Sequence, residues 1–518
     1  MARFLLPGLE NFDRRATASP PRTLPHRHSG AIAKDVAHLA TACRTLARLR
    51  TGALFPVVRQ FVIVPAKRSS HYFALMDQVN LGMIGGGTVG GGVYQALTRN
   101  GDLLAARAGV AVRVRRIAVK AFDEPRKVEI PEVLLTTDWR SLVADPDIHI
   151  VAELAGGTGI AREMILAALK LGKPVVTANK ALLSACGEEL FAAARAHGTN
   201  LYYEASVAGG IPIIKALREG FIGNRILRLY GIVNGTCNYI LTRMKLEGAD
   251  FAEVLADAQR QGYAEMPPDL DIDGHDSLHK IGILASLAHG FWVKPGQIHV
   301  EGIRNISKLD IQFAGQLGYT IKLLGVVKKM PAGARARPSP NGGPVQVAVY
   351  PALIPNAHVL AGVNHAFNAV FVRGDVVGDT LFYGRGAGQD PTASAVLSDL
   401  ADAALDLKSG TRTRIPPFVA HERHGRVLPI AEAVSRFYLR LSVADRPGVL
   451  AKVAAVLARN RIGISSVFQP EGHEGDSVPL ILMIHDAPNR AMSRALAQIG
   501  RLPVVKAKPM MLRVETFE

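Results

Sequence analysis

The sequence predicts an α/β protein built on a Rossmann-type, doubly wound parallel sheet. Residues 81–97, LGMIGGGTVGGGVYQAL, run from an apolar strand through a glycine-rich turn into a helix. Further short strands, at 147–157 and 173–184, follow at the spacing of an open parallel sheet. The chain has 518 residues, 48% of them apolar. This length predicts three or four domains, and this composition allows a sizeable core.

The first 75 residues are expected to lie outside the fold as a disordered extension, with an Arg-rich transit peptide as the alternative. Residues 1–77 hold 12 Lys or Arg against 4 Asp or Glu. Their net charge of +8 is almost half of the +17 of the whole chain. The remaining surplus lacks the interleaved aromatic and basic residues of nucleic-acid grooves. No apolar run reaches the roughly 18 residues that a membrane helix needs. We therefore expect no nucleic acid and no membrane as partners. Three dispersed cysteines fit a cytoplasmic location.

The glycine-rich turn after strand 79–84 predicts a dinucleotide site. Gly85 permits the turn, Gly87 lets the backbone approach a pyrophosphate, and Gly90 allows the helix to pack on its strand. The helix is predicted to begin at residue 93, and the free amides of its first turn would attract the negatively charged pyrophosphate. The alternative is a glycine-rich connection without a ligand. The expected cofactor contacts are Gly85, Gly87, Thr88, Val89 and Gly90.

The second strand, residues 112–120, favours NADP over NAD. It ends in Lys120, where an NAD-preferring site usually carries an acid for the ribose hydroxyls. Arg126 follows closely, and a cation here suits a ribose phosphate. Asp123 and Glu124 also lie nearby, so NAD stays open as the alternative.

Two later segments supply groups for chemistry. The strand in 173–184 ends in a turn with Lys180, which is expected beyond the carboxyl ends of the strands, where ligands bind. In residues 262–280, GYAEMPPDLDIDGHDSLHK, Asp276 and Lys280 are four residues apart and share one helical face, so the carboxylate can orient the ammonium. Glu265 and Asp271 could receive the amino group of a zwitterionic substrate. Taken alone, this stretch is better explained as a solvated acidic loop.

The order of the motifs along the whole chain favours a functional site over a solvated loop. The motifs GGGTVGGG, VAELAGG, VVTANKALLS, YEASVAGGIPII, NGTCNYI, DIDGHDSLHK and GRGAGQDPTASAV together resemble homoserine dehydrogenase over residues 79–430. That family interconverts aspartate semialdehyde and homoserine with a nicotinamide cofactor, on the route to threonine, methionine and isoleucine. The resemblance implies a cofactor domain at 76–207 plus 376–430, a catalytic and dimerisation domain with a mixed sheet at 208–375, and a homodimer or homotetramer.

The resemblance also assigns roles to residues. Lys280 becomes the acid catalyst, Lys180 lies between cofactor and substrate, and Asp276 is a polar partner of the lysine. The substrate contacts are Tyr263, Glu265 and Asp271. A sodium site, formed mainly by main-chain carbonyls, falls at Glu204, Val207, Gly209 and Ile211. Gly386 and Gly388 belong to a loop that returns over the cofactor. Pro267 departs from the family pattern, which has a carboxylate there.

Residues 436–518 form a further module. Their strand, helix and strand pattern occurs twice and resembles the ferredoxin-like ACT domain, which senses amino acids. The turn Asp445, Arg446, Pro447, Gly448 opens a helix whose free amides could face an effector carboxylate, with threonine expected. A purely structural oligomerisation domain is the alternative. For the whole chain, the alternatives to the enzyme are an amino-acid sensor without turnover and another semialdehyde reductase.

Overall fold

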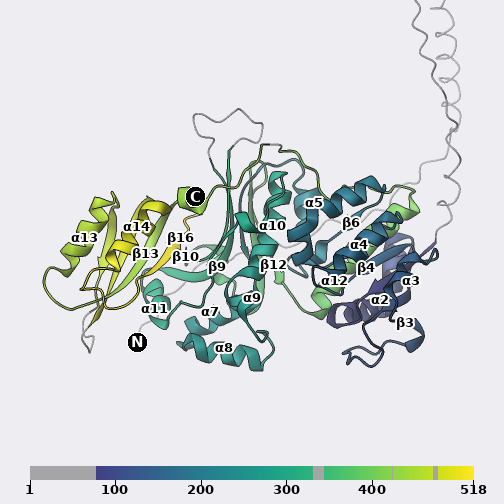
Figure 1. Ribbon diagram of the computed structural model, residues 1–518, viewed down its shortest axis with the longest axis horizontal. Helices are drawn as coiled ribbons and strands as arrows, with labels where there is room; N and C mark the ends of the chain where they lie inside the picture. The colour runs from purple at the N-terminus through teal and green to yellow at the C-terminus, as the bar shows by residue number, and fades with distance from the viewer. Residues whose placement is uncertain (1–76, 331–342, 423, 471–476, 518) are drawn as a thin grey trace, which may run out of the picture. The chain divides into compact units, whose positions relative to one another are not determined.

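Two β-sheets organise the residues that the computed structural model describes, which are 77–330, 343–422, 424–470 and 477–517 (Figure 1). The predicted extension 1–75 lies outside these residues. Within the described ranges, no helix is both long and apolar enough to cross a membrane.

The first sheet has six parallel strands in the order β3-β2-β1-β4-β5-β6, which confirms the Rossmann-type prediction. The direction of winding reverses between β1 and β4, and this reversal opens a crevice at the carboxyl ends of the two strands. The strands are β1 (Gln78–Ile84), β2 (Ala111–Ala118), β3 (Leu135–Thr136), β4 (Ile150–Glu153), β5 (Val175–Thr177) and β6 (Leu201–Tyr202). The accompanying helices are α2 (Thr88–Ala108), α3 (Trp139–Ala144), α4 (Ile160–Lys170), α5 (Lys180–Ala196) and α12 (Gln389–Lys408).

Helix α2 begins at Thr88, five residues before the predicted start, so the second glycine triplet is helical. A Cβ on Gly90 would lie 2.0 Å from the carbonyl oxygen of Gly85, at the end of β1. A Cβ on Gly92 would lie 2.6 Å from Cγ of Gln389 in α12. The triplet therefore serves close packing, and α12 returns from far along the chain to cover α2.

The second sheet is mixed and has ten strands, nine of them in the order β12-β11-β7-β9-β10-β16-β13-β15-β14, with β8 beside β10. Its first strands are β7 (Ile226–Ile232), β8 (His299–Val300), β9 (Tyr319–Lys329), β10 (Val345–Pro355), β11 (Phe367–Gly374) and β12 (Gly378–Arg385). The helices around them are α6 (Ile213–Lys215), α7 (Gly235–Glu247), α8 (Phe251–Arg260), α9 (Asp269–Ile272), α10 (His275–His289) and α11 (Lys308–Gln316).

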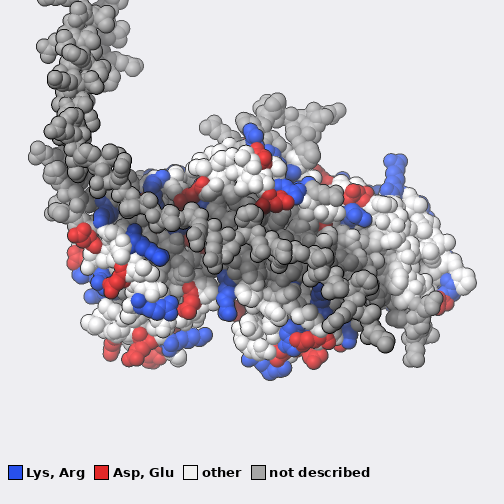
Figure 2. Space-filling model, turned by 180° about the vertical axis from the view of Figure 1, so that it is seen from behind, with Lys and Arg blue, Asp and Glu red and all other residues white. Residues whose placement is uncertain are grey.

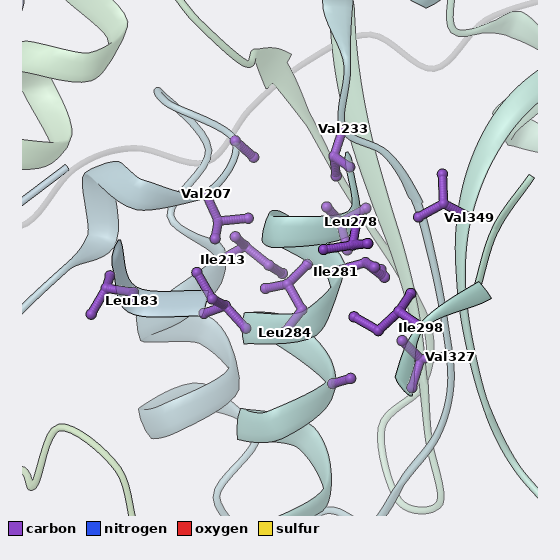
Figure 3. Packing of buried hydrophobic residues seen from close by; sticks show 14 of the residues in the cluster. Leu183, Val207, Ile213, Val233, Leu278, Ile281, Leu284, Ile298, Val327 and Val349 are labelled. Atoms are coloured by element: carbon purple, nitrogen blue, oxygen red, sulfur yellow. The ribbon is translucent and has the colours of Figure 1, made fainter. Parts of the chain in front are cut away.

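Helix α10 lies in the largest hydrophobic core, between α5 and the second sheet (Figure 3). Its side chains Leu278, Ile281 and Leu284 are buried among Leu183 of α5 and Val327 of β9. Because this packing fixes α10 from both sides, the polar residues at its first turns hold a defined position.

The C-terminal residues repeat a strand, helix and strand pattern, as the sequence predicts, and form the sheet order β16-β13-β15-β14. Strand β16 also pairs in parallel with β10, through Ala352 and Arg513 among others. The C-terminal strands therefore continue the second sheet. The elements are β13 (Val434–Val443), α13 (Val449–Arg459), β14 (Ile464–Phe468), β15 (Val478–Pro488), α14 (Asn489–Ile499) and β16 (Met510–Val514).

Charged side chains of both signs alternate over the described surface seen in Figure 2. On this face, the positive surplus outside the N-terminal segment is spread among acidic groups. It therefore forms no single basic stripe among the residues shown there.

Candidate active site

The glycine turn after β1 lies in the crevice of the first sheet. Gly85 has a φ of +109°, and a Cβ there would lie 2.7 Å from the carbonyl of Leu154, just after β4. Gly87 is the N-cap of α2 and has open space around it. The first amides of α2 thus face an accessible cradle without a capping side chain, which fits a dinucleotide pyrophosphate.

A pocket of about 540 Å³ extends from this turn and is lined by Lys120, Glu124 and Trp139, among others. The sequence pattern does not predict Trp139 as a contact, because this residue lies in the helix after β3, away from the glycine motif. The guanidinium of Arg126 donates instead to the carbonyls of Ala121 (2.6 Å) and Phe122 (2.9 Å). Arg126 therefore closes the loop after β2, and Lys120 is the basic residue that lines the pocket.

A buried network fixes the opposite wall. Glu153, which is fully buried, accepts the hydroxyl of Thr177 at 2.7 Å and two amides of its own turn. Asn179 caps α5 and donates to the carbonyl of Gly157 at 2.7 Å. These bonds hold the turn after β4 against the start of α5, where Lys180 is the first helical residue.

Asp276 joins the two predicted lysines. Its carboxylate lies 2.7 Å from Nζ of Lys280 and 3.2 Å from Nζ of Lys180. The ammonium of Lys280 also donates to the carbonyl of Val233 at 2.7 Å. Burial alone would raise the pKa of Asp276, but the charges of Lys280 and Lys180 lower it overall. The sequence prediction of a carboxylate that orients Lys280 agrees with this geometry.

Asn234 completes the cluster, although it is not among the predicted site residues. Its amide donates to Asp271 (2.7 Å) and Asp276 (2.9 Å), while its oxygen accepts the amide of Cys237 as the N-cap of α7. An asparagine before Gly-Thr-Cys is a typical N-cap pattern. That pattern marks the helix start but gives no sign of the two carboxylates.

The acidic stretch divides between two sides of α9. Asp271 faces Asn234, and burial raises the pKa of its carboxyl, with the nearby charges of Asp276 and Glu265 acting in the same direction. Asp269 and Asp273 instead form ion pairs with Arg304. The stretch is therefore neither wholly a solvated loop nor wholly a site.

Tyr263 and Glu265 lie in the exposed segment before α9. The ring of Tyr263 stacks on Tyr239 with centroids 4.6 Å apart. Pro267 is exposed, and Pro268 is the N-cap of α9. The departure at Pro267 thus leaves Asp271 within hydrogen-bond distance of Asn234.

The turn predicted to hold sodium meets the returning loop. A Cβ on Gly209, whose φ is +48°, would lie 2.6 Å from the carbonyl oxygen of Gly386. Buried Glu204 accepts the amides of Ile214 (2.9 Å) and Lys215 (2.7 Å), and burial raises its pKa to about 7.

Three further residues complete the description of this region. Ile211 accepts the amide of Ile213 through its carbonyl, and Gly388 is the N-cap of α12. Val207 follows a one-turn 3-10 helix at Glu204–Ser206 and is buried. Among the described residues, no group of three or more His, Cys, Asp or Glu could hold a metal ion.

The chain is similar to known proteins in both sequence and fold. Residues 85–204 match the family model for the NAD-binding domain of homoserine dehydrogenase, and residues 212–401 match the homoserine dehydrogenase model. The homoserine dehydrogenase of Pseudomonas aeruginosa is 42% identical over 445 residues, which are 85% of this chain and 99% of that protein.

Solved structures give the same result. A homoserine dehydrogenase from Thiobacillus denitrificans has a TM-score of 0.78 at 42% identity, covering 85% of this chain and 98% of that one. A hyperthermophilic archaeal homoserine dehydrogenase in complex with NADPH has a TM-score of 0.53 at 26% identity, covering 64% of this chain and 98% of that one. With the glycine cradle and the Lys180–Asp276–Lys280 cluster, these similarities show that the chain belongs to the homoserine dehydrogenase family of NAD(P)-dependent oxidoreductases.

Proposed function

We propose that this protein interconverts L-homoserine and L-aspartate 4-semialdehyde, with Lys280 as the acid–base group and Lys180 beside it. The observation that carries the proposal is the position of Asp276 within 3.2 Å of both ammonium groups. Such a cluster can give a proton to, or take it from, a single substrate oxygen.

A bound nicotinamide supplies or accepts the hydride. Two N–H bonds of Lys280 are engaged by Val233 and Asp276, so the third is free to point at the substrate oxygen. In the reducing direction, charge develops on that oxygen, and the ammonium both stabilises it and donates the proton. Lys180, whose side chain is 41% exposed, would reach the same oxygen from the cofactor side.

The substrate amino group would lie against Glu265 and Asp271, with Tyr263 as part of the same wall. The negative charges of Asp276 and Glu265 both raise the pKa of Asp271. An incoming ammonium would relieve that repulsion, which favours a zwitterionic substrate over a simple aldehyde.

For the cofactor we propose NADP, with NAD as the alternative. Lys120 lines the pocket where a ribose phosphate would lie, and a relative forms a complex with NADPH. Glu124 lines the same pocket and weakens this preference. A sodium ion held by carbonyls of the turn Glu204, Val207, Gly209 and Ile211 is proposed as a structural support for the cofactor loop.

For the C-terminal module we propose an ACT-type regulatory role, with threonine as the effector. Its sheet order β16-β13-β15-β14 with two helices is ferredoxin-like. Helix α13 begins after Gly448, whose φ is +85°, without a capping side chain. An assembly domain is the alternative, and we expect the protein to act as a homodimer or homotetramer.

A kinetic assay tests the central proposal. The loss of NADPH absorbance is followed with aspartate semialdehyde, for the native chain and Lys280→Ala. The variant should lose turnover by about 10²–10⁴-fold and keep its cofactor affinity, because Lys280 acts on charge that develops only in the transition state. An equal loss of NADPH binding by fluorescence titration would contradict the role of Lys280. Threonine binding without any turnover of the native chain would favour the sensor.

A further inference from the structure

Arg513, near the end of the chain, carries a buried charge into the catalytic part of the molecule. It lies on β16 and is 3% exposed. Its guanidinium donates to Glu301 at 2.8 Å and to Asn489 at 3.0 Å, and it lies 4.6 Å from the ring centroid of Tyr350. A buried arginine with several such contacts holds its carboxylate partner in one position. It thereby also fixes the backbone segment that carries Glu301.

Glu301 belongs to a segment, residues 301–304, that is in close contact with α9. The next residue, Gly302, is so close that a Cβ there would lie 2.2 Å from the carbonyl oxygen of Ile272. The amide of Ile303 donates to that same oxygen at 2.8 Å, and Arg304 forms an ion pair with Asp273 at 2.8 Å. A displacement of Glu301 would therefore be passed to the backbone of α9.

Helix α9 in turn carries the substrate wall. Asp271, next to Ile272, accepts the amide of Asn234 at 2.7 Å, and the same amide reaches Asp276 at 2.9 Å. An unbroken series of hydrogen bonds and close contacts thus leads from β16 to the carboxylate that joins the two catalytic lysines.

We propose that Arg513 and Glu301 are positioning residues for the substrate site. Their ion pair holds the 301–304 segment against α9 and so sets the position of Asp271 relative to Asn234. This inference rests on the proposed role of Asp271 in substrate binding. It predicts that homoserine affinity depends on a side chain from the last strand of the protein.

The chain offers a matched control for the ion pair. Arg440 of β13 also joins the C-terminal module to the catalytic part, through the fully buried Asp310 at 2.6 Å. Asp310 lies on α11, which packs on β9 and α7. Arg440→Met should therefore cost stability in a similar way without moving α9.

The experiment compares KM for homoserine, KM for NADP, kcat and melting temperature in Glu301→Gln, Arg513→Met, Arg513→Lys and Arg440→Met. Glu301→Gln and Arg513→Met should raise KM for homoserine on the order of tenfold, since small misplacements of binding groups are costly. KM for NADP should change by less than about twofold, because the cofactor cradle is formed by the first sheet. Arg513→Lys should restore part of the loss, because it retains the charge.

Two outcomes would overturn the inference: a homoserine KM in Arg513→Met equal to that of Arg440→Met at similar melting temperatures, or no partial rescue in Arg513→Lys. Asp271→Asn separates the inference from its premise. If Asp271→Asn leaves KM for homoserine unchanged, the proposed role of Asp271 is wrong. If it raises KM while both ion-pair variants behave like the control, only the positioning role is wrong.

Discussion

Asp276 has an unusual position for a carboxylate, since it is 11% exposed and has an ammonium on each side. Burial opposes its charge, yet Lys280 and Lys180 lower its pKa overall, so it remains ionised at any working pH. The pair of lysines is tolerated in a confined space because this one charge lies between them.

Replacing Asp276 with Asn tests that arrangement. The amide oxygen can still accept from Lys280, but both ammonium groups lose their counter-charge. We expect kcat/KM for homoserine to fall by roughly 10²-fold or more, the usual size for a misoriented acid–base group. Steady-state kinetics and an NADP titration would measure this, and a fall limited to cofactor affinity would contradict it.

A comparison of the native protein with Asp276→Asn also tests how the stability of the fold depends on pH. The folded pKa of Asp276 lies below its ordinary value of 3.8, so its stabilisation is complete above that value and is lost as pH falls through the folded pKa. Native protein should exceed Asp276→Asn by about 3 kcal/mol in unfolding free energy at pH 7, with a smaller gap near pH 3. Urea unfolding at the two pH values measures it. A gap that does not change with pH would show that packing, not charge, distinguishes the two proteins.

Part of this site was predictable from spacing alone. Asp276 and Lys280 share a helical face, and that relation holds in the structure. The sequence also names Asp271 as a possible substrate contact, but it does not show that α9 turns Asp271 towards Asn234 and places Asp269 and Asp273 on the side of Arg304. For Asn234 the sequence indicates only a helix cap. Its hydrogen bonds to Asp271 and Asp276 join distant segments and could not be predicted from the local pattern.

Helix α2 shows how packing overrides propensity. Glycine disfavours helices, which is why the sequence places the start at residue 93. In the structure α2 begins at Thr88, and glycine stands at position 92 because a side chain there would collide with Gln389 of α12. The return of α12 to the first sheet thus explains glycines that look like loop residues.

Two alanine substitutions in α2 separate these effects. Gly92→Ala would place a methyl group 2.6 Å from Cγ of Gln389 and 3.1 Å from its carbonyl oxygen, so this side chain and the start of α12 must shift, and we expect lower stability and weaker NADP binding. Gly101, in the same helix, has no atom within 4 Å of its Cβ position. Gly101→Ala should therefore raise the unfolding free energy by roughly 0.5–1 kcal/mol. Equal changes in melting temperature for both variants would refute this explanation.

Helix α13 allows a test of the proposed effector site that leaves the fold intact. Leu450, at the second helical position, is 44% exposed. Leu450→Pro removes one free amide at little cost to the helix, because proline is tolerated in the first turn. Threonine inhibition should weaken about fivefold or more. Leu450→Ala keeps the amide and should be inhibited as the native chain is; identical inhibition of both variants would place the site elsewhere.

The second sheet joins the C-terminal module to the catalytic part of the molecule. Sequence patterns predict the strands and helices of the module but not this connection, because the pairing of β10 with β16 links distant segments. Glu515 adds to it through Lys328 at 2.6 Å and the hydroxyl of Tyr350 at 2.7 Å. Regulation is therefore better tested by point variants than by removal of the module, which would leave buried charges without partners.

The N-terminal segment gives the opposite prediction. Residues 1–75 carry no pattern capable of burying apolar surface, so their deletion should leave specific activity and melting temperature almost unchanged. Purified protein beginning at Met76 can be compared directly with the full chain. A loss of many degrees would show that the segment packs on the fold.

The pairing of β16 with β10 also determines when the protein can fold during its synthesis. Strand β10 leaves the ribosome long before Arg513 is translated, so the part of its edge at Ala352 and Leu353 stays open while the whole module is made. An open strand edge in a nascent chain favours aggregation. We therefore expect newly made chains to need chaperones until translation ends, and a stop codon just before β16 to be more harmful than the few missing residues suggest.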